Sequence, residues 1–423
     1  MKLLRASDGK EVSLASAKAL GVGGEARIYA VLDMLGQAAK VYHRPTPERG
    51  TKLAAMLANP PEDPLRGEGH VSIAWPTELL LSRNGSGVVM GFLMPRVRGM
   101  SPIIDFYHPK TRRRRHPLFN YHYLLRTAHN LAACVAALHA RNYVIGDLNE
   151  SNILVDETAL VTLVDTDSFQ VPDKANSKVY RCRVGKPEFT PPELQSVTFA
   201  WVDLKPEHDL FGVAVLLFQL LMEGIHPFAG PQPGRDEPTP LEERIAAGWF
   251  PYAPGRPCET QPMPTAPSFS SLPREIRELF LRCFVEGHAE PSKRPTAQMW
   301  QQALQEAEGD LVGCSANEQH RYDAHLKSCP WCERKRLLGG LDPFPSRDEI
   351  AQNRHLQPAL TPFAPRRLRT ADFRTLDYET AVGIAQAAMR RKQRIRKVTL
   401  VACWLLGAAL LVYWIWMLVL AFS

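Results

Sequence analysis

The stretch VIGDLNESNILVDETALVTLVDTDSF, residues 144–169, decides the fold assignment. It contains Asp147, then Asn152 five positions later and Asp165 thirteen positions after that. In phosphoryl transfer, one carboxylate orients the attacking hydroxyl, while an asparagine and a second aspartate hold Mg²⁺ against the triphosphate. Because all three residue types occur in order at these spacings, the stretch predicts a Mg²⁺-dependent phosphotransfer site.

A glycine-rich turn near the start of the chain supports this prediction. Gly21, Gly23 and Gly24 lie between two expected strands, where glycine lets the backbone approach phosphates without a Cβ in the way. Lys40 follows on the next expected strand, as a cation for the α and β phosphates requires. Alone, such a turn is typical of an ordinary hairpin and such a lysine of a protein surface. Their order ahead of residues 144–169 favours phosphate binding.

In these motifs the sequence resembles the eukaryotic-like (Hanks-type) serine/threonine protein kinases of bacteria, over roughly residues 15–308. It is most similar to the atypical branch whose members occur beside a PP2C-type phosphatase and a von Willebrand type A protein. The resemblance implies a two-lobed α+β fold over residues 1–308, with a strand-rich N-lobe at about 1–97 and a helical C-lobe at about 98–308. It also implies ATP, Mg²⁺ or Mn²⁺, and a protein substrate, with the phosphatase and the von Willebrand type A protein as candidate partners.

The resemblance assigns further residues to the nucleotide site. The positions after the glycine-rich turn and in the hinge are Ala26, Ile28, Met94 as gatekeeper, Pro95 and Val97. Glu48 is the acid that would pair with Lys40, because it is the only acid in the helix expected at 47–59. Its place beside Pro47 is equally explained by a favourable contact with the helix dipole.

Three other matches predict architecture. Glu193 in VGKPEFTPPEL and Arg294 in EPSKRPTAQMW are expected to form a buried ion pair, whose partners are costly to remove singly. Asp209 is expected to open the long central helix and to hold the loop around Asp147.

The stretch departs from the kinase pattern at the residues before and after its aspartates. Ile145 and Gly146 stand where kinases have H-R, so the arginine that reads a phosphorylated activation loop is absent. Asp167 replaces the glycine of the D-F-G element, and we expect it to serve as a second Mg²⁺ ligand or as a loop anchor. Control through activation-loop phosphorylation is therefore not expected.

A lysine that serine/threonine kinases place near the γ-phosphate is also missing. Asn149 occupies its position, which removes a cation from a transition state that needs one. Lys186 stands where such kinases have a threonine, and we expect it to supply the charge from the other side of the site. The alternative is a surface lysine in a degenerate site. The sequence thus leaves two functions open: an active serine/threonine kinase, or a pseudokinase scaffold that binds nucleotide or protein partners without phosphotransfer.

A cysteine cluster follows the kinase-like region in CSANEQHRYDAHLKSCPWC, residues 314–332. Cys329 and Cys332 form a C-x-x-C turn, and Cys314 with His320 completes a tetrahedral Cys₃His set. His325 is the alternative histidine. Four protein ligands leave no open position, which indicates structural Zn²⁺ in a module at 309–338.

The remaining part of the chain predicts attachment to a membrane. Residues 398–422 carry no charge and, at about 1.5 Å per residue, can cross a bilayer core of roughly 30 Å. A linker and a basic juxtamembrane helix are expected at 339–397, ending in RRKQRIRK, which marks the cytoplasmic side. We therefore expect a single-pass, tail-anchored protein of the cell membrane with its kinase-like domain in the cytoplasm. The basic run at 112–115 is expected to be solvated or to dock an acidic partner, and the absence of interleaved aromatics does not favour nucleic acid.

Overall fold

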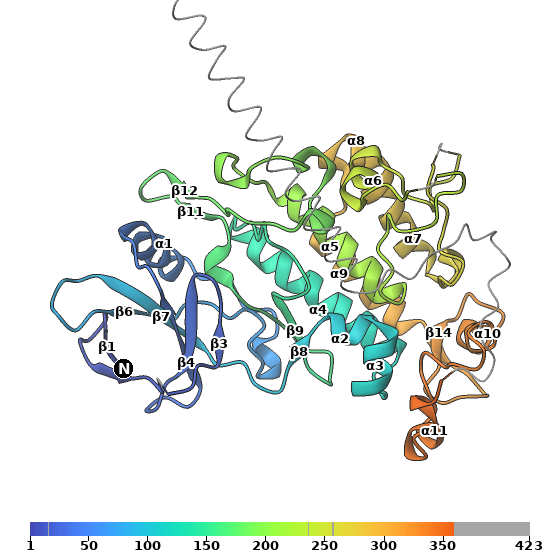
Figure 1. Ribbon diagram of the computed structural model, residues 1–423, viewed down its shortest axis with the longest axis horizontal. Helices are drawn as coiled ribbons and strands as arrows, with labels where there is room; N and C mark the ends of the chain where they lie inside the picture. Colours follow the sequence, from blue (N-terminus) through green and yellow to red (C-terminus); the bar gives the residue numbers. More distant parts are fainter. Residues whose placement is uncertain (16, 236, 256–257, 359–423) are drawn as a thin grey trace, which may run out of the picture. The chain divides into compact units, whose positions relative to one another are not determined.

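The computed structural model describes residues 1–15, 17–235, 237–255 and 258–358. These residues form a strand-rich N-lobe, a helical C-lobe and a small cysteine-containing module (Figure 1). The predicted membrane span at 398–422 and the basic stretch before it lie outside the described residues. In the part of the chain that is described, no helix is long and apolar enough to cross a bilayer.

The N-lobe is built on a seven-stranded antiparallel sheet in the order β2-β1-β6-β7-β5-β4-β3. Its strands are β1 (Lys2–Arg5), β2 (Glu11–Ser13), β3 (Gly21–Val22), β4 (Ala26–Ala30), β5 (Gln37–Tyr42), β6 (Glu78–Leu81) and β7 (Val89–Pro95). Helix α1 (Pro47–Ala58) begins after Thr46, whose side chain accepts a hydrogen bond from the Arg49 N–H. Its buried residues include Leu53 and Met56, and the helix contacts β6 and β7.

Strands β3, β4 and β5 of this sheet carry the predicted Gly21 and Lys40. Gly21 faces Ile28 across β3 and β4, and Lys40 faces Phe92 across β5 and β7. Gly91 is needed beside Lys40, because a Cβ there would lie 2.0 Å from the Lys40 carbonyl oxygen. The sheet therefore holds the backbone of Lys40 against β7.

The C-lobe packs its helices around α5, which is apolar and buried along nearly its whole length. The helices are α2 (Ile104–Tyr107), α3 (Pro109–Arg115), α4 (Tyr121–Ala140), α5 (Pro206–Leu221), α6 (Leu241–Ala247), α7 (Arg274–Leu281), α8 (Gly287–Ala289) and α9 (Ala297–Gly309). The short strands are β8 (Ser101–Pro102), β9 (Ile153–Val155) and β10 (Val161–Leu163) in one sheet, and β11 (Val171–Asp173) with β12 (Lys178–Tyr180) in another. Helices α4 and α9 lie against each other, and α4 contacts α5. Loops at the ends of these elements carry the predicted site.

The cysteine-containing module packs directly on the C-lobe. It consists of β13 (Leu311–Gly313), β14 (Arg321–Asp323), α10 (Pro330–Leu337) and α11 (Arg347–Ala351), with α10 and α11 drawn in orange in Figure 1. Trp331 of α10 is 2% exposed and packs against Tyr121 of α4 at a ring distance of 4.8 Å. Phe344 is 1% exposed and stacks edge-on with Trp331, also at 4.8 Å. The predicted linker thus begins too early at 339, because Phe344 is part of the packed core.

One arginine of the basic run is a structural element of this contact. Arg112 is buried beneath the module, pairs with Glu223 at 3.7 Å and lies over the Phe344 ring at 4.5 Å. Arg334 of α10 forms a second ion pair with Glu223, which is also buried. The expectation that residues 112–115 are a solvated run or a docking patch is therefore wrong for Arg112, which joins the module to the C-lobe.

Candidate active site

The loop that carries Asp147 is held from below by the central helix. Asp209 of α5 accepts hydrogen bonds from the Ile145 and Gly146 N–H groups at 2.7 and 2.8 Å. Gly146 has φ +72°, and a Cβ there would lie 2.8 Å from Cys182 and Leu204 atoms. The position where kinases have arginine thus has neither the backbone conformation nor the space for a side chain. The absence of the regulatory arginine, inferred from the sequence, agrees with this packing.

Asp147 and Asn152 lie side by side in this loop. The Asn152 Nδ2 donates to the Asp147 carboxylate at 3.1 Å and to its carbonyl oxygen at 3.0 Å. Burial raises the pKa of the Asp147 carboxyl above its usual value, and the charge of Asp165 adds to this. The asparagine amide fixes the carboxylate orientation while its own oxygen stays available to a cation.

Lys186 approaches the same loop from residues 181–205, which join β12 to α5 and correspond to the activation segment of the kinase pattern. Its ammonium donates to the Glu150 carboxylate at 2.8 Å, and its charge lowers the pKa of Asp147. Asn149 is buried and turns inward, where its oxygen accepts from the Ser151 N–H at 3.0 Å and its amide donates to the Asp147 carbonyl. The structure thus brings Lys186 close to the catalytic loop and gives Asn149 a role in shaping that loop.

Lys40 meets both aspartates of the DTD sequence. Its ammonium lies 2.5 Å from the Asp165 carboxylate and forms a second, short ion pair with Asp167. The Asp165 side chain is 42% exposed, whereas that of Asp167 is 7% exposed. Tyr42 donates a hydrogen bond to the other oxygen of Asp167 at 2.8 Å. Asp165 therefore remains accessible to a metal ion, while both oxygens of Asp167 are engaged by the protein, as the loop-anchor alternative expected.

The electrostatic balance at this pair favours charge on both partners. Burial alone would raise the pKa of Asp167, but the charge of Lys40 and the hydrogen bonds from Lys40 and Tyr42 together lower it. Burial likewise opposes the charge on Lys40, and the two aspartates more than offset it, so the pKa of Lys40 is raised. The pair is therefore ionised at neutral pH.

Glu48 does not take the predicted place beside Lys40. It accepts a hydrogen bond from Arg183 of the activation segment at 2.8 Å and lies 3.8 Å from Lys178. Lys52 of α1 is electrostatically coupled to the Lys40 site. Burial lowers the pKa of Lys52 to about 8, the charge of Asp167 raises it, and the charge of Lys40 lowers it further. The helix dipole at the N-terminus and the basic activation segment explain Glu48 instead.

The glycine-rich turn and the hinge lie at the two ends of the central strands. His43 makes a hydrogen bond with the Gly23 carbonyl at 3.1 Å, and Glu25 of the same turn pairs with Arg49 of α1 at 2.9 Å. At the other end, Met94 faces Ala38 across β5 and β7. The remaining predicted positions around the turn and hinge are Gly21, Gly24, Ala26, Ile28, Pro95 and Val97. The turn is thus tied to α1 as well as to the sheet.

The donor set fits a nucleotide with Mg²⁺. Asn152 and Asp165 offer an amide and a carboxylate oxygen, the ligand types that Mg²⁺ binds. The Val164 N–H donates to the Asn152 carbonyl at 2.9 Å, which keeps the two ligands on adjacent segments. Lys40 is the cation available for phosphate beside them.

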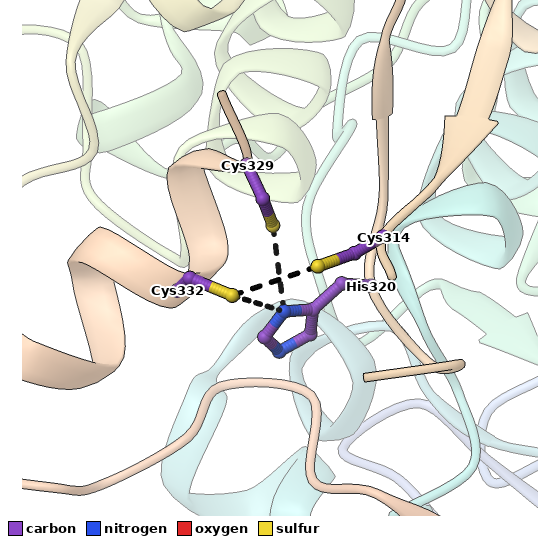
Figure 2. Close-up of side chains that lie close together, drawn as sticks. All are labelled: Cys314, His320, Cys329 and Cys332. Carbon is purple, nitrogen blue, oxygen red and sulfur yellow. Dashed lines mark hydrogen bonds between the residues drawn. The ribbon is translucent and has the colours of Figure 1, made fainter. Parts of the chain in front are cut away.

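The predicted zinc ligands converge in the module. Figure 2 shows Cys314, His320, Cys329 and Cys332 pointing toward one another, and their ligand atoms all lie within 4.8 Å. The Cys314 and Cys332 sulfurs are 3.6 Å apart. The His320 Nδ1 lies 3.4 Å from the Cys329 sulfur and 3.5 Å from the Cys332 sulfur. Tetrahedral Zn²⁺ with bonds of about 2.3 Å to sulfur and about 2.0 Å to nitrogen requires separations of roughly 3.8 Å between two sulfurs and roughly 3.5 Å between sulfur and nitrogen. The four side chains therefore fit this ion.

The ligand histidine is oriented by a buried carboxylate. The His320 Nε2 lies 2.9 Å from the Asp342 carboxylate and 3.0 Å from the Asn317 amide. A carboxylate on the far nitrogen fixes which ring nitrogen faces the metal. His325 lies elsewhere, with its ring bonded to Asp323 and to the Ser270 carbonyl. The structure thus distinguishes the two histidines that the sequence left open.

Several residues of these sites were missed by sequence reasoning. They are Tyr42, Lys52, Glu150, Glu223 and Asp342. Tyr42 gave a usable signal, because it lies two positions after Lys40 on the same strand and therefore on the same face. The others act through contacts that have no local pattern.

One protein family matches the helical C-lobe of the chain. Residues 102–306 match the protein kinase domain family, and the preceding sheet and helix complete a kinase-like α+β fold. Residues 102–306 are therefore similar to a protein kinase domain, within a kinase-like fold.

Two curated relatives from Escherichia coli, each named protein kinase YegI, come from O157:H7 and from strain K12. Both are 36% identical over 316 residues, which cover 74% of this chain and 48% and 47% of the relatives. The chain thus spans about half the length of the curated relatives it matches. A solved structure, the ROP18 kinase domain in complex with AMP-PNP and sucrose, is similar over 72% of this chain and 82% of its own, at a TM-score of 0.47 and 16% identity. The expected association with a PP2C-type phosphatase and a von Willebrand type A protein stays a prediction.

Proposed function

We propose that this chain is a protein kinase that transfers phosphate from ATP, with Mg²⁺, to serine or threonine hydroxyls. The observation that carries the proposal is the meeting of Lys40, Asp147, Asn152 and Asp165, which come from three separate segments. Decayed kinases usually lack at least one of these groups, and all four are present here. The relatives' printed name, protein kinase, supports the same reaction class.

Each of these residues has a role that its contacts support. Asp147 accepts or orients the substrate hydroxyl, held for this by Asn152 at 3.1 Å. Asn152 and Asp165 would hold Mg²⁺, and Lys40 would bind the α and β phosphates. When bound, the metal nucleotide supplies the phosphoryl group and neutralises its charge.

Lys186 is the candidate for the missing γ-phosphate cation. Its partner Glu150 precedes Ser151 in the loop that carries Asp147, and the Lys186 charge lowers the pKa of Asp147. We expect Lys186→Ala to lower kcat by roughly 10²-fold, the size of one lost charge-stabilising group, with the affinity for ATP held within a few-fold. Unchanged turnover in that variant would mean that Lys186 only pairs with Glu150 and does not act on the γ-phosphate.

Membrane attachment and zinc binding complete the proposal. The uncharged run at 398–422, preceded by RRKQRIRK, supports a single membrane span with the kinase domain in the cytoplasm. The fit of Cys314, His320, Cys329 and Cys332 to tetrahedral geometry supports structural Zn²⁺. The buried contact through Trp331 makes this module a part of the kinase C-lobe rather than a free spacer.

The test is transfer of labelled phosphate from ATP with Mg²⁺ or Mn²⁺, to the chain itself and to a generic protein acceptor. Asp147→Asn and Asp165→Asn should each lower the rate by roughly 10²–10⁴-fold. Glu278→Gln, in an exposed pair on α7, is the matched control and should leave the rate unchanged. Label that survives both active-site changes would come from a contaminant. Nucleotide binding without transfer in the unaltered chain would instead favour the pseudokinase scaffold.

A further inference from the structure

The carboxylate that holds Lys40 comes from a different part of the fold than in other protein kinases. There, the strand lysine pairs with a glutamate of the N-lobe helix. Here the buried partner of Lys40 is Asp167 in the short helical turn Thr166–Ser168, two residues after the exposed Asp165. The metal-binding loop itself therefore supplies the counter-ion.

Asp167 is built into this position from several sides. One of its oxygens receives Lys40 and the other receives the Tyr42 hydroxyl, and both donors stand on β5. The neighbouring Thr166 is 1% exposed and donates its hydroxyl to the Ala74 carbonyl at 2.9 Å. A carboxylate held by two donors from one strand keeps that strand and the loop in a single register.

Helix α1 offers the opposite charge. Its single acid, Glu48, is bound to Arg183 at 2.8 Å. Lys52 lies one turn before the fully buried Met56, and burial lowers its pKa to about 8 against the attraction of Asp167. Compared with the usual lysine and glutamate, the carboxylate that holds Lys40 thus comes from the loop, which carries a second aspartate, and not from the helix.

We propose that Asp167 is the positioning residue for Lys40, replacing the helix glutamate. The position of Lys40 is then set by the loop that carries Asp165. Movement of α1 alone leaves the Lys40 pair intact, so this domain lacks the usual control through that helix. This inference rests on the proposed nucleotide site.

The experiment is a charge exchange between the loop and the helix. Asp167→Asn should weaken binding of a fluorescent ATP analogue with Mg²⁺ and lower kcat/KM by roughly 100-fold, the loss expected when one partner of a buried charge pair is removed. Adding Lys52→Glu to that variant returns a carboxylate from the helix and should recover about tenfold or more of the loss. Glu48→Gln removes the helix's own acid, and the resulting loss in kcat/KM should be smaller than that in Asp167→Asn by a factor of about ten or more.

Each outcome decides between the two arrangements. The inference would be overturned if Asp167→Asn bound nucleotide and turned over as well as the unaltered chain. It would also be overturned if Glu48→Gln lost as much kcat/KM as Asp167→Asn. Melting curves identify a double variant that fails to fold, and the comparison of the two single variants then decides. If the unaltered chain binds nucleotide but transfers no phosphate, the proposed reaction fails while the affinities still test the role of Asp167. A chain that binds no nucleotide would overturn both.

Discussion

The contact between the cysteine-containing module and the C-lobe makes a prediction about stability. Glu223 lies between Arg112 and Arg334, and the side chains of the three residues are 2%, 1% and 9% exposed. Burial lowers the pKa of Arg112 to about 10, so this guanidinium is still charged at neutral pH. Glu223→Gln keeps the shape of the side chain and leaves two buried cations without a counter-ion. We expect it to lower the free energy of unfolding by roughly 3–5 kcal/mol.

The measurement is urea denaturation of the full chain at neutral pH, followed by circular dichroism. Glu278→Gln is the matched control, because its exposed pair with Arg274 within one helix is worth only about 0.3–0.5 kcal/mol. A further variant that changes Arg112, Glu223 and Arg334 together to methionine should regain most of the loss, since the cost comes from unpaired charge rather than from lost contact. A Glu223→Gln chain within about 1 kcal/mol of the control would refute the view that the module is docked through a buried ion triad.

Two other measurements test the metal site and a buried histidine. The purified chain should contain Zn²⁺, and Cys329→Ser with Cys332→Ser should abolish this and lower stability, because binding of structural zinc contributes to folding. Burial lowers the pKa of His226 to about 4 from 6.5, so its stabilisation is complete above pH 6.5 and is lost as pH falls toward 4. At pH 5 this loss is about 2 kcal/mol, and a His226→Gln chain should lack that part of the acid sensitivity.

Controls for these two measurements follow from neighbouring residues. His325→Ala should keep the zinc, because His325 is bonded to Asp323 rather than facing the cysteines. For the histidine, the Nε2 donates to the Glu188 carbonyl and the Nδ1 accepts from the Phe228 N–H, so only the neutral ring satisfies both contacts. Zinc content that is unchanged in the double cysteine variant, or equal acid sensitivity with and without His226, would contradict these predictions.

Local sequence was sufficient for the elements whose signals are short. Asn120 caps α4 by accepting from the His122 N–H at 3.1 Å, and Pro47 stands in the first turn of α1. The helix expected at 47–59 is observed as α1 at Pro47–Ala58. The ion pair between Glu193 and Arg294 was also predicted, and the structure forms it with two bonds of 2.7 Å. Such features depend on neighbouring residues or on a motif with fixed spacing.

The partners of charged residues could not be predicted in the same way. The sequence pointed to Glu48 as the partner of Lys40 and to Asp167 as a metal ligand or loop anchor. The actual pairing depends on where the DTD loop meets β5 in space. The burial of Arg112 depends on Glu223 and on a module more than two hundred positions later in the chain. A run of arginines has the same sequence whether it is solvated or buried, because its burial depends on which distant segments pack over it.

The sequence by itself determined which reaction class and which ligands to predict: the spacing of Asp147, Asn152 and Asp165 and the C-x-x-C turn are local constraints that only a few chemistries satisfy. Only the tertiary structure decided which carboxylate holds Lys40 and which histidine, His320, faces the cysteines. The physical reason is that an ion pair or a metal site forms between segments that the fold brings within a few ångströms, and the energy of that contact depends on burial, which no local pattern records.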